Sequence, residues 1–494
     1  MNTFDVVVVG AGNAAFCAAH AARERVDSVL MLEKAPRAWI GGNSYFSAGA
    51  FRTTYRGLDD LRPLLDLRED EAARIDLPAY TPDDFRADML RVTEGRCDPE
   101  LTEILVGEVA ETARWMRDRG VRWKLQFERQ SFEVDGRRRF WGNLPLGTVR
   151  EGVGMIEQHL SAAGGSGVEL RCESPARRLL REGRRVVGVV VEGPDGLYEV
   201  RAGAVVLACG GFEADPRMRA MYLGPGWDVA RVRGTPYNTG EGLTMAIEAG
   251  AQPYGHWSGC HAIQWDAAAP PTGDRELLHR LSKQSYPLGI MVNREGQRFV
   301  DEGADFRNYT YAKYGAEVLK QPGATAFQLF DARTVPLLRQ DEYSAPGVSR
   351  HEAGTVEDLA DALGIDRASL TRTVDGFNAA VQSGPFDPTI KDGKRTTGID
   401  PPKSNWALPL DTPPFVAFAV TCGITFTFGG IRIDRDARVL DERGTPIPGL
   451  YAAGELVGGL FYHNYPGGSG LASGSVFGRR AGAAAGDQVS QRHG

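Results

Sequence analysis

Near the start of the chain stands the stretch Asp5-Val6-Val7-Val8-Val9-Gly10-Ala11-Gly12-Asn13-Ala14-Ala15, which decides the fold. Its four consecutive valines are typical of a strand that is buried on both faces of a parallel sheet. The glycines open an alanine-rich segment that we predict to be a helix as far as about Arg25, and Val29–Glu33 is a second strand-like run. This order of strand, glycine turn, helix and strand predicts a dinucleotide-binding βαβ unit.

The residues of the glycine turn each have a physical reason to be there. Gly10 permits a tight turn, Gly12 lets the backbone approach a pyrophosphate, and Ala15 lets the helix lie close to the strand. The helix then begins beside the phosphates, where its free N–H groups and its dipole favour negative charge. Glu33 ends the second strand and can accept hydrogen bonds from ribose hydroxyls.

The chain of 494 residues is too long for one compact core, and its amino-acid composition changes along its length. Aromatic residues, His and Pro become dense from about Gly255 to about Pro414. After that, the pattern of the first segment recurs. A strand-like run ends in glycine at Pro448–Glu455, and an Ala/Gly-rich helix follows Gly467–Gly470. We therefore predict one domain split by an inserted second one, with boundaries at 1–255, 256–414 and 415–494.

Nucleotide-binding features at both ends of the chain favour FAD over a nicotinamide coenzyme. A nicotinamide enzyme usually carries its coenzyme on one contiguous domain, whereas FAD is long enough to cross the edge of the sheet. The other local match to the glycine pattern, Gly152-Val153-Gly154, has no strand before it, so we expect no second site for NAD(P)H. The predicted fold class is α/β, a split Rossmann-like FAD-binding domain with an inserted α+β capping domain.

Composition excludes several other classes of protein. The chain has 57 Lys and Arg against 64 Asp and Glu, a net charge of −7, so no global basic field attracts nucleic acid. No run of 18 apolar residues predicts a membrane span, and Met1–Asp5 lacks the basic region of a secretory signal, which predicts a cytoplasmic protein. The six cysteines include no C-x-x-C pair, so we expect no metal site.

Motifs along the whole chain resemble the fumarate reductase/succinate dehydrogenase flavoprotein superfamily, in its soluble branch. The matching segments, in the family's order, are Gly10–Ala15, Glu33-Lys34, Gly41–Ser44, Ala208–Gly211, Thr239–Gly242, Met291–Phe299, Gly449–Glu455 and Gly467–Gly470. With the βαβ unit, the resemblance implies FAD contacts at Gly10, Gly12, Asn13, Ala14, Ala15, Glu33, Lys34, Gly42, Asn43, Ser44, Gly49, Ala176, Ala208, Gly210, Asn238, Glu241, Glu455, Ser469, Gly470 and Leu471.

The flavin is expected to be non-covalent. Membrane-bound relatives attach FAD through a histidine just before the glycine-rich segment near Ala48-Gly49, and here Asn43–Ser47 contains no histidine. The helix that opens after Gly470 would point its positive end at the N1/O2 edge of the flavin and stabilise the reduced anion.

Three further segments resemble tricarballylate dehydrogenase, a member of the same superfamily. They are Asp301–Tyr311, Cys422–Gly430 and Phe461–Gly470. This resemblance implies an FAD-dependent dehydrogenase that acts on a CH–CH bond next to a carboxylate, converting a tricarboxylate to cis-aconitate with hydride transfer to flavin N5. It also implies a separate membrane iron–sulfur protein as a candidate electron acceptor.

The resemblance to fumarate reductases implies that Arg307 exchanges the substrate proton. Two departures from their pattern argue against fumarate or succinate as the native substrate. The segment Thr425–Thr427 stands where those enzymes have His-His-Thr, and Tyr465 and Pro466 stand where they have a carboxylate-binding arginine. In addition, the acid and arginine that relay the proton have no counterpart around Leu281–Ser285.

Other residues are candidates to replace the missing groups. We predict His463 and Tyr465 as further catalytic residues, and His261, Tyr309, Phe426 and Thr427 as substrate contacts. The Tyr-Pro-Gly sequence also resembles the Δ1-ketosteroid dehydrogenases, so a steroid-like enone stays an alternative substrate, as does another small molecule handled in fumarate-reductase fashion. An electron-transfer flavoprotein without substrate chemistry of its own is the alternative of another class.

Overall fold

The computed structural model describes residues 2–493, and its first half is built on a mainly parallel sheet. The central strand β1 pairs in parallel with β2 and β11, and the valines at its centre are fully buried. The order of the sheet is β18-β19-β11-β1-β2-β8, with β10 and β9 continuing from β11. These strands are β1 (Thr3–Val9), β2 (Val29–Leu32), β8 (Glu169–Arg171), β9 (Ala176–Glu182), β10 (Arg185–Gly193), β11 (Gly196–Leu207), β18 (Arg438–Leu440) and β19 (Pro446–Ala452).

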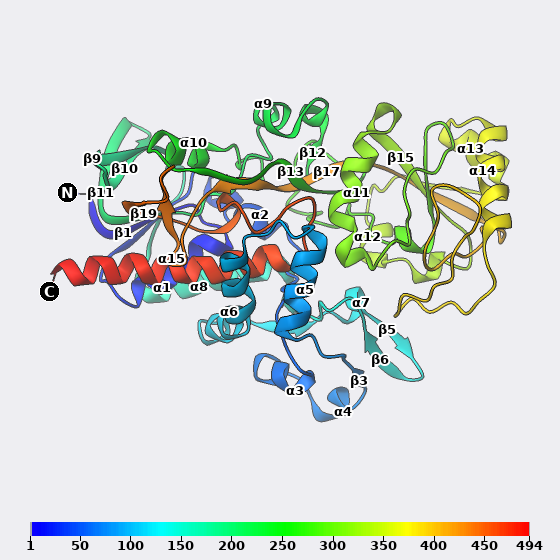
Figure 1. Cartoon of the computed structure of the whole chain (residues 1–494), viewed down its shortest axis with the longest axis horizontal. Coiled ribbons are helices and arrows are strands. Elements are labelled where there is room, and N and C mark those ends of the chain that lie inside the picture. Colours follow the sequence, from blue (N-terminus) through cyan, green and yellow to red (C-terminus); the bar gives the residue numbers. More distant parts are fainter. Residues whose placement is uncertain (1, 494) are drawn as a thin grey trace.

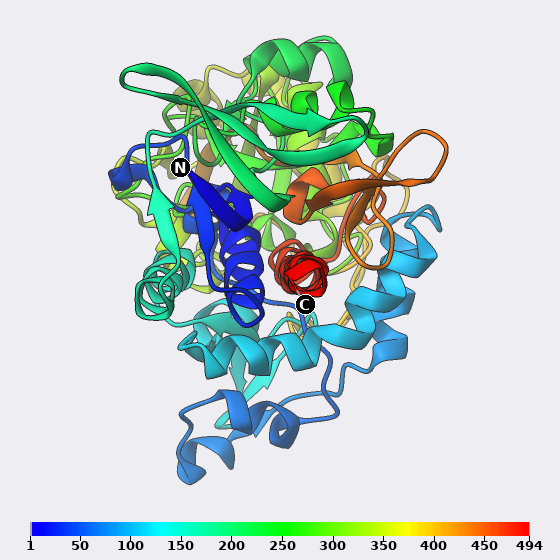
Figure 2. The ribbon, with the colours of Figure 1, turned by 90° about the vertical axis from the view of Figure 1, so that its left-hand side faces the viewer.

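Helices from the two ends of the chain lie side by side on one face of this sheet (Figure 2). They are α1 (Asn13–Arg23) and α15 (Ser469–His493), and α8 (Glu151–Ser166) lies against the other flank of α1. A Cβ atom at Gly478 would come within 2.4 Å of the carbonyl oxygen of Ala14, and one at Gly482 within 2.0 Å of that of Ala18. The two helices therefore approach to near backbone contact, which only small residues allow.

A second sheet forms the other half of the molecule (Figure 1). Its order is β12-β17-β15-β14, and β13 and β16 also pair with β17. Four helices accompany it: α11 (Tyr311–Leu319), α12 (Gln340–Tyr343), α13 (Val356–Leu363) and α14 (Arg367–Ala380). The strands are β12 (Arg231–Val232), β13 (Pro253–Asp266), β14 (Ile290–Asn293), β15 (Thr325–Phe330), β16 (Arg350–Ala353) and β17 (Phe415–Ile431).

Two long antiparallel strands connect the halves. The pairing of β13 with β17 runs from Pro253 opposite Ile431 to Asp266 opposite Val420. The division of the chain at residues 255 and 414 falls at the start of these strands, and we keep it as a proposal. The arrangement of a Rossmann-like sheet beside a mixed α and β cap confirms the predicted fold class.

Many of the remaining elements lie below the first sheet in Figure 1, whereas α9 and α10 are drawn above it. The longest is α6, whose first turn is capped by Asp98, where the carboxylate accepts a hydrogen bond of 3.0 Å from the N–H of Leu101. These elements are α2 (Gly42–Tyr45), α3 (Leu58–Leu61), α4 (Glu69–Ala72), β3 (Ile75–Asp76), α5 (Pro82–Val92), α6 (Pro99–Asp118), β4 (Trp123–Leu125), α7 (Phe127–Gln130), β5 (Ser131–Val134), β6 (Arg137–Phe140), β7 (Leu146–Thr148), α9 (Pro216–Met218) and α10 (Glu241–Glu248).

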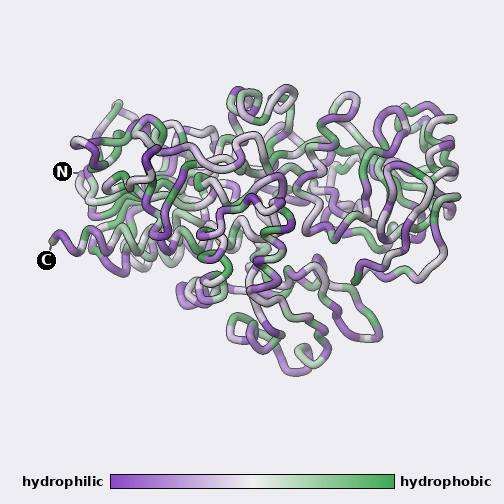
Figure 3. The backbone as a smooth tube through the Cα atoms, in the orientation of Figure 1, coloured by the Kyte–Doolittle hydropathy of each residue, from purple (hydrophilic) through white to green (hydrophobic). Residues whose placement is uncertain are grey.

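The apolar segments gather in the sheets, and hydrophilic segments follow the outer helices and loops (Figure 3). None of the helices within residues 2–493 combines the length and the apolar character needed to cross a membrane.

Candidate active site

A cleft opens where the carboxyl ends of the parallel strands meet the second sheet. Val9, Leu32 and Ala208 stand at the ends of β1, β2 and β11 and line it. This edge of an open parallel sheet is where such folds bind ligands. The cleft continues past Phe426 on β17 to side chains of the cap, so one cavity joins the nucleotide-binding edge to the inserted region.

The predicted cofactor residues fall into two groups in this cleft. Those that line it are Gly10, Gly12, Asn13, Ala14, Glu33, Lys34, Gly42, Asn43, Ser44, Ala176, Ala208, Gly210, Asn238, Glu241, Glu455, Gly470 and Leu471. Three others do not line it. Ala15 is fully buried within α1, Gly49 lies so close to Thr148 that a Cβ atom would be 2.3 Å from Oγ1, and the Ser469 hydroxyl donates to the carbonyl of Pro466. A cofactor contact at these three positions stays a prediction.

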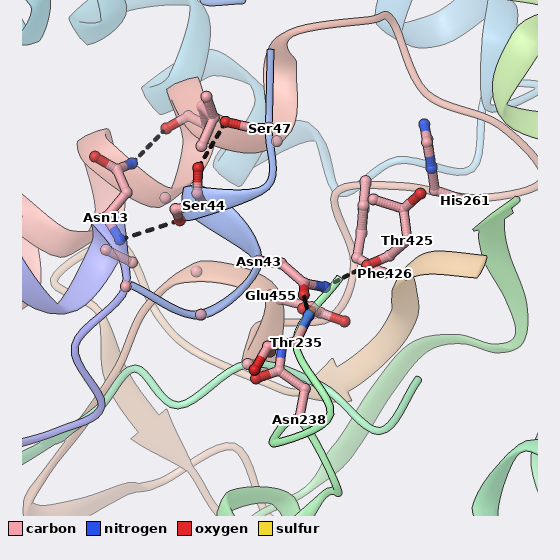
Figure 4. Close-up of a pocket in the computed structure, with 18 of the residues that line it drawn as sticks. Asn13, Asn43, Ser44, Ser47, Thr235, Asn238, His261, Thr425, Phe426 and Glu455 are labelled. Carbon is pink, nitrogen blue, oxygen red and sulfur yellow. Dashed lines mark hydrogen bonds between the residues drawn. The ribbon is translucent and has the colours of Figure 1, made fainter. Parts of the chain in front are cut away.

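The turn before α1 has the shape that a pyrophosphate requires. Gly10 has a φ of +113°, and a Cβ atom there would lie 2.4 Å from the carbonyl oxygen of Ala208, so only glycine fits. A Cβ atom at Gly12 would meet nothing closer than Ser44 Oγ at 3.6 Å, so the backbone there faces the open cleft. The N–H of Asn13 donates to Ser44 Oγ at 3.1 Å (Figure 4). This helix start fits the phosphates of a dinucleotide.

The far end of the same groove carries the acid predicted to hold a ribose. Glu33 is buried, and its carboxylate accepts a 2.8 Å hydrogen bond from the N–H of Ala35. Burial raises the pKa of Glu33, while that hydrogen bond works in the opposite direction. Beside it, Lys34 Nζ forms an ion pair of 2.7 Å with Glu241, and both side chains line the cleft.

Two carboxyl groups, the fully buried Glu213 and the half-buried Glu455, lie next to each other at the cleft. Glu213 accepts hydrogen bonds from the side-chain amides of Asn43 at 2.5 Å and Asn238 at 2.7 Å, and Glu455 accepts one from the N–H of Thr427 at 2.7 Å. Figure 4 shows Asn43, Asn238 and Glu455 converging there. Burial, followed by the neighbouring carboxylate of Glu455, raises the pKa of Glu213 well above its usual value.

Arg307 reaches the cleft from the cap. It stands just before α11 and is 7% exposed. Its guanidinium donates to Gln284 Oε1 at 2.9 Å and to the carbonyl of Arg129 at 2.5 Å, and it lies 4.8 Å from the centre of the Trp141 ring. Neither hydrogen-bond partner is an acid, and Arg307 forms no salt bridge with a carboxylate within residues 2–493.

Tyr465 also faces the cleft, where its hydroxyl is hydrogen-bonded to that of Tyr311. The His261 ring stands edge-on to both tyrosines, at 5.0 Å and 4.9 Å between ring centres, and stacks on Phe426 at 5.1 Å. Neither ring nitrogen of His261 has a hydrogen-bond partner. Burial, and then the charge of Arg233, hold the pKa of His261 well below its usual value, so the ring is neutral.

Two of the predicted site residues lie outside the lining of the cleft. The Tyr309 hydroxyl points away from the cleft and donates to Asp88 at 2.7 Å, so this side chain holds the α5 segment. The His463 side chain is 38% exposed and lies against His256 and Glu94, outside the residues that line the cleft. Thr427 does line the cleft, but its backbone and hydroxyl donate to Glu455, so it serves the cofactor half.

Sequence reasoning missed an arginine and acid cluster next to Arg307. Arg129 pairs with Glu342 at 2.9 Å and with Asp341 at 2.5 Å, and Arg339 pairs with Glu342 at 2.8 Å. The acids come from α12, far in sequence from the segment 281–285 where we looked for a relay. No local motif marks them, because the cluster forms only when α7 and α12 meet. Arg233, also unforeseen, lines the same cleft.

The chain matches the protein family described as FAD binding domain over residues 5–471. A probable fumarate reductase of Shewanella frigidimarina is 31% identical over 490 residues, covering 97% of this chain and 74% of the relative. The 4-oxocyclohexanecarboxylate 2-dehydrogenase of Sinomonas cyclohexanicum is 30% identical and covers 94% and 90%. The open form of a flavocytochrome c3 fumarate reductase superimposes with a TM-score of 0.74 at 28% identity, covering 99% of this chain and 79% of that one.

Proposed function

The chain belongs to the FAD binding domain family, within the fumarate reductase/succinate dehydrogenase flavoprotein superfamily, and from that premise we propose that it oxidises or reduces a CH–CH bond in a small carboxylic acid. Membership makes it an FAD-dependent oxidoreductase that acts on CH–CH donors. The fit of the Gly10–Asn13 turn to a pyrophosphate agrees with that cofactor.

The observation that carries the proposal is Arg307, which is buried at the cleft and forms no salt bridge with any carboxylate among residues 2–493. An anionic substrate supplies the missing charge. When bound, FAD accepts or delivers a hydride. Arg307 then holds the substrate by its carboxylate and, in the reducing direction, gives a proton from a guanidinium N–H to the carbon next to the one that receives the hydride. Gln284 and the Arg129 carbonyl fix the guanidinium plane, so the proton stays aimed into the cleft.

Among small acids we propose two finer substrate classes. A tricarboxylate oxidised to an unsaturated acid is the first, and it rests on the sequence motifs around Arg307 and Tyr465. A cyclic oxo acid is the second, because the Tyr311 and Tyr465 hydroxyls offer a hydrogen bond to a carbonyl in the same cleft as the arginines. The dehydrogenase of Sinomonas cyclohexanicum is named for such an acid. A membrane iron–sulfur partner and a cytoplasmic location stay proposals from the sequence.

Anaerobic photometry of the purified holoprotein tests this function. The flavin absorbance near 450 nm is followed while succinate, tricarballylate, 4-oxocyclohexanecarboxylate or a 3-oxosteroid is added, and the dye-reduced protein is mixed with the unsaturated acids. We expect at least one acid to bleach or reoxidise the flavin within seconds, and the uncharged steroid to do so far more slowly. A protein whose flavin responds to electron carriers but to no acid is an electron-transfer flavoprotein instead.

A further inference from the structure

Arg233 is a buried arginine whose charge the chain leaves unmatched. It follows β12, is 9% exposed, and its backbone N–H donates to the carbonyl of Ile424 at 2.8 Å. Its guanidinium makes one hydrogen bond, a long one of 3.3 Å to the hydroxyl of Thr425, and Nε is buried without any partner. Across residues 2–493 it forms no salt bridge with an acid, although its side chain lines the cleft.

A buried guanidinium in this condition is costly, because a desolvated charge needs hydrogen bonds or an opposite charge. Another buried arginine of the same chain shows how a purely structural guanidinium is hydrogen-bonded. Arg219 is equally buried, and its guanidinium donates to four backbone carbonyls, those of Glu213, Trp227, Asp228 and Ala230. Arg233 has no such set. Its free N–H groups are therefore available to a ligand in the cleft.

The neighbours of Arg233 in the cleft complete a site for a carboxylate. The Thr425 hydroxyl lies on its guanidinium, and the neutral His261 ring has two nitrogens without partners, one of which can donate. Figure 4 shows Thr425, Phe426 and His261 close together at one end of the cleft. Arg307 enters the same cleft from the turn before α11, a different element. The cleft thus presents two arginines without acids from two parts of the chain.

We propose that Arg233, with Thr425 and His261, binds a carboxylate of the substrate that Arg307 does not hold. The substrate then carries an anionic group at the Arg233 end of the cleft and reacts at the Arg307 and Tyr465 end, as in a dicarboxylate, a tricarboxylate or an oxo acid. This inference rests on the proposed function and narrows it, since it makes Arg233 a specificity-determining residue. A simple enone without a carboxylate lacks the group that Arg233 requires.

The experiment compares Arg233→Gln and Arg233→Lys with Arg231→Gln in the holoprotein. Arg231 lies two residues earlier on β12 and does not line the cleft, so it is the matched control. The change in the flavin spectrum is titrated with succinate, tricarballylate and 4-oxocyclohexanecarboxylate, and with the methyl ester of the last. FAD content and the thermal unfolding midpoint are measured for each variant, and turnover is measured with every acid that the wild type accepts.

We expect Arg233→Gln to raise the Kd and KM for the acids by about 10- to 100-fold, which is the usual loss for a hydrogen bond to a charged group, while kcat falls less than about 3-fold. Arg233→Lys should recover part of the affinity, and Arg231→Gln should bind like the wild type. The wild type should prefer the oxo acid to its ester, and Arg233→Gln should lose most of this preference.

Three results overturn the inference. The first is acid binding by Arg233→Gln at wild-type strength. The second is a loss of FAD, or a changed flavin spectrum without ligand, in Arg233→Gln and Arg233→Lys, which assigns Arg233 to the cofactor. The third, which needs no variant, is equal binding of acid and ester by the wild type. A different result, a wild-type flavin that no acid perturbs, contradicts the proposed function itself. The failure of this inference and the failure of the proposed function can therefore be told apart.

Discussion

Arg307 and Tyr465 are the two candidates for the residue that exchanges a proton with the substrate. Both line the cleft, but they offer different chemistry. Arginine gives up a proton only to a strong base, such as a substrate carbanion, whereas a tyrosine hydroxyl can also polarise a carbonyl. The Tyr465 hydroxyl is already hydrogen-bonded to Tyr311, and burial raises the pKa of Tyr465 well above its usual value, so the hydroxyl keeps its proton.

We therefore expect Arg307→Lys to lower kcat by about 10²- to 10⁴-fold, with little change in KM and none in FAD content. Lysine keeps the charge but lacks the planar fork that Gln284 and the Arg129 carbonyl hold. Single-turnover flavin photometry against each acid measures the effect. An active Arg307→Lys variant, together with a similar loss in Tyr465→Phe, would move the proton to the tyrosine.

The Glu213 and Glu455 pair predicts how stability depends on pH. Because the pKa of Glu213 in the folded protein lies above that of an exposed glutamate, its contribution to stability is present at low pH and is lost as the pH rises toward the folded-state pKa. Glu213→Gln keeps the oxygen that Asn43 and Asn238 bind and gives Glu455 an N–H donor.

The variant should match the wild type near pH 5 and exceed it increasingly toward pH 9, by about 1–3 kcal/mol, the usual cost of a buried group left unsatisfied. Thermal unfolding at constant ionic strength from pH 5 to 9 measures the difference. Asp441→Asn, at a surface turn, is the control and should show no such rise, since the pKa of Asp441 is lowered. A difference that shrinks with rising pH would mean that the pair carries no proton.

At the scale of elements, the close approach of α1 and α15 holds the cofactor groove together. Asn13 on α1 donates to Ser475 Oγ at 2.9 Å and to the carbonyl of Leu471 at 3.1 Å on α15. The glycines of α15 bring the two backbones to this distance. A displacement of α15 would therefore move the start of α1, where the pyrophosphate is expected, and the cofactor half of the cleft with it.

Gly482→Ala should destabilise the protein by about 1–3 kcal/mol and weaken FAD retention, because its Cβ atom would lie 2.0 Å from the carbonyl oxygen of Ala18. Gly107→Ala in α6 is the control. Nothing lies within 4 Å of a Cβ atom there, so alanine should stabilise the helix by about 0.5–1 kcal/mol. Thermal unfolding and the FAD-to-protein ratio after gel filtration measure both, and equal behaviour of the two variants would contradict this packing.

A structural feature can be predicted from the sequence when the residues that form it lie close together in the chain. It cannot when they come from distant segments. The βαβ unit is local, so Val6–Val9, Gly10 and Glu33 can be placed from spacing alone. Tyr309 and Tyr311 lie two residues apart, and only the turn before α11 decides that Tyr311 faces the cleft while Tyr309 contacts Asp88. The importance of Arg233 lies in the lack of an acid beside it, which no motif encodes.

At the scale of the whole molecule, no covalent bond to the flavin is expected, so the fold alone must retain it. The cleft residues nearest the predicted attachment segment are Ser44, Ser47 and Ala48, none of which is a histidine. Acid or heat should therefore release all of the FAD into the supernatant, as measured by absorbance and by chromatography against authentic FAD. Yellow colour that stays with the precipitated protein would contradict this expectation.

The pairing of α1 with α15 has a consequence for how the protein is made. While the ribosome synthesises the chain, the glycine turn at Gly10–Asn13 emerges almost at once, but its partner Leu471 emerges more than four hundred residues later. During that interval the nascent chain contains the glycine turn of the predicted flavin groove without the α15 residues that contact it. A translation product that stops before α15 lacks the cleft residues Gly470, Leu471, Ser473 and Gly474, so we expect it to retain flavin less firmly than the full chain.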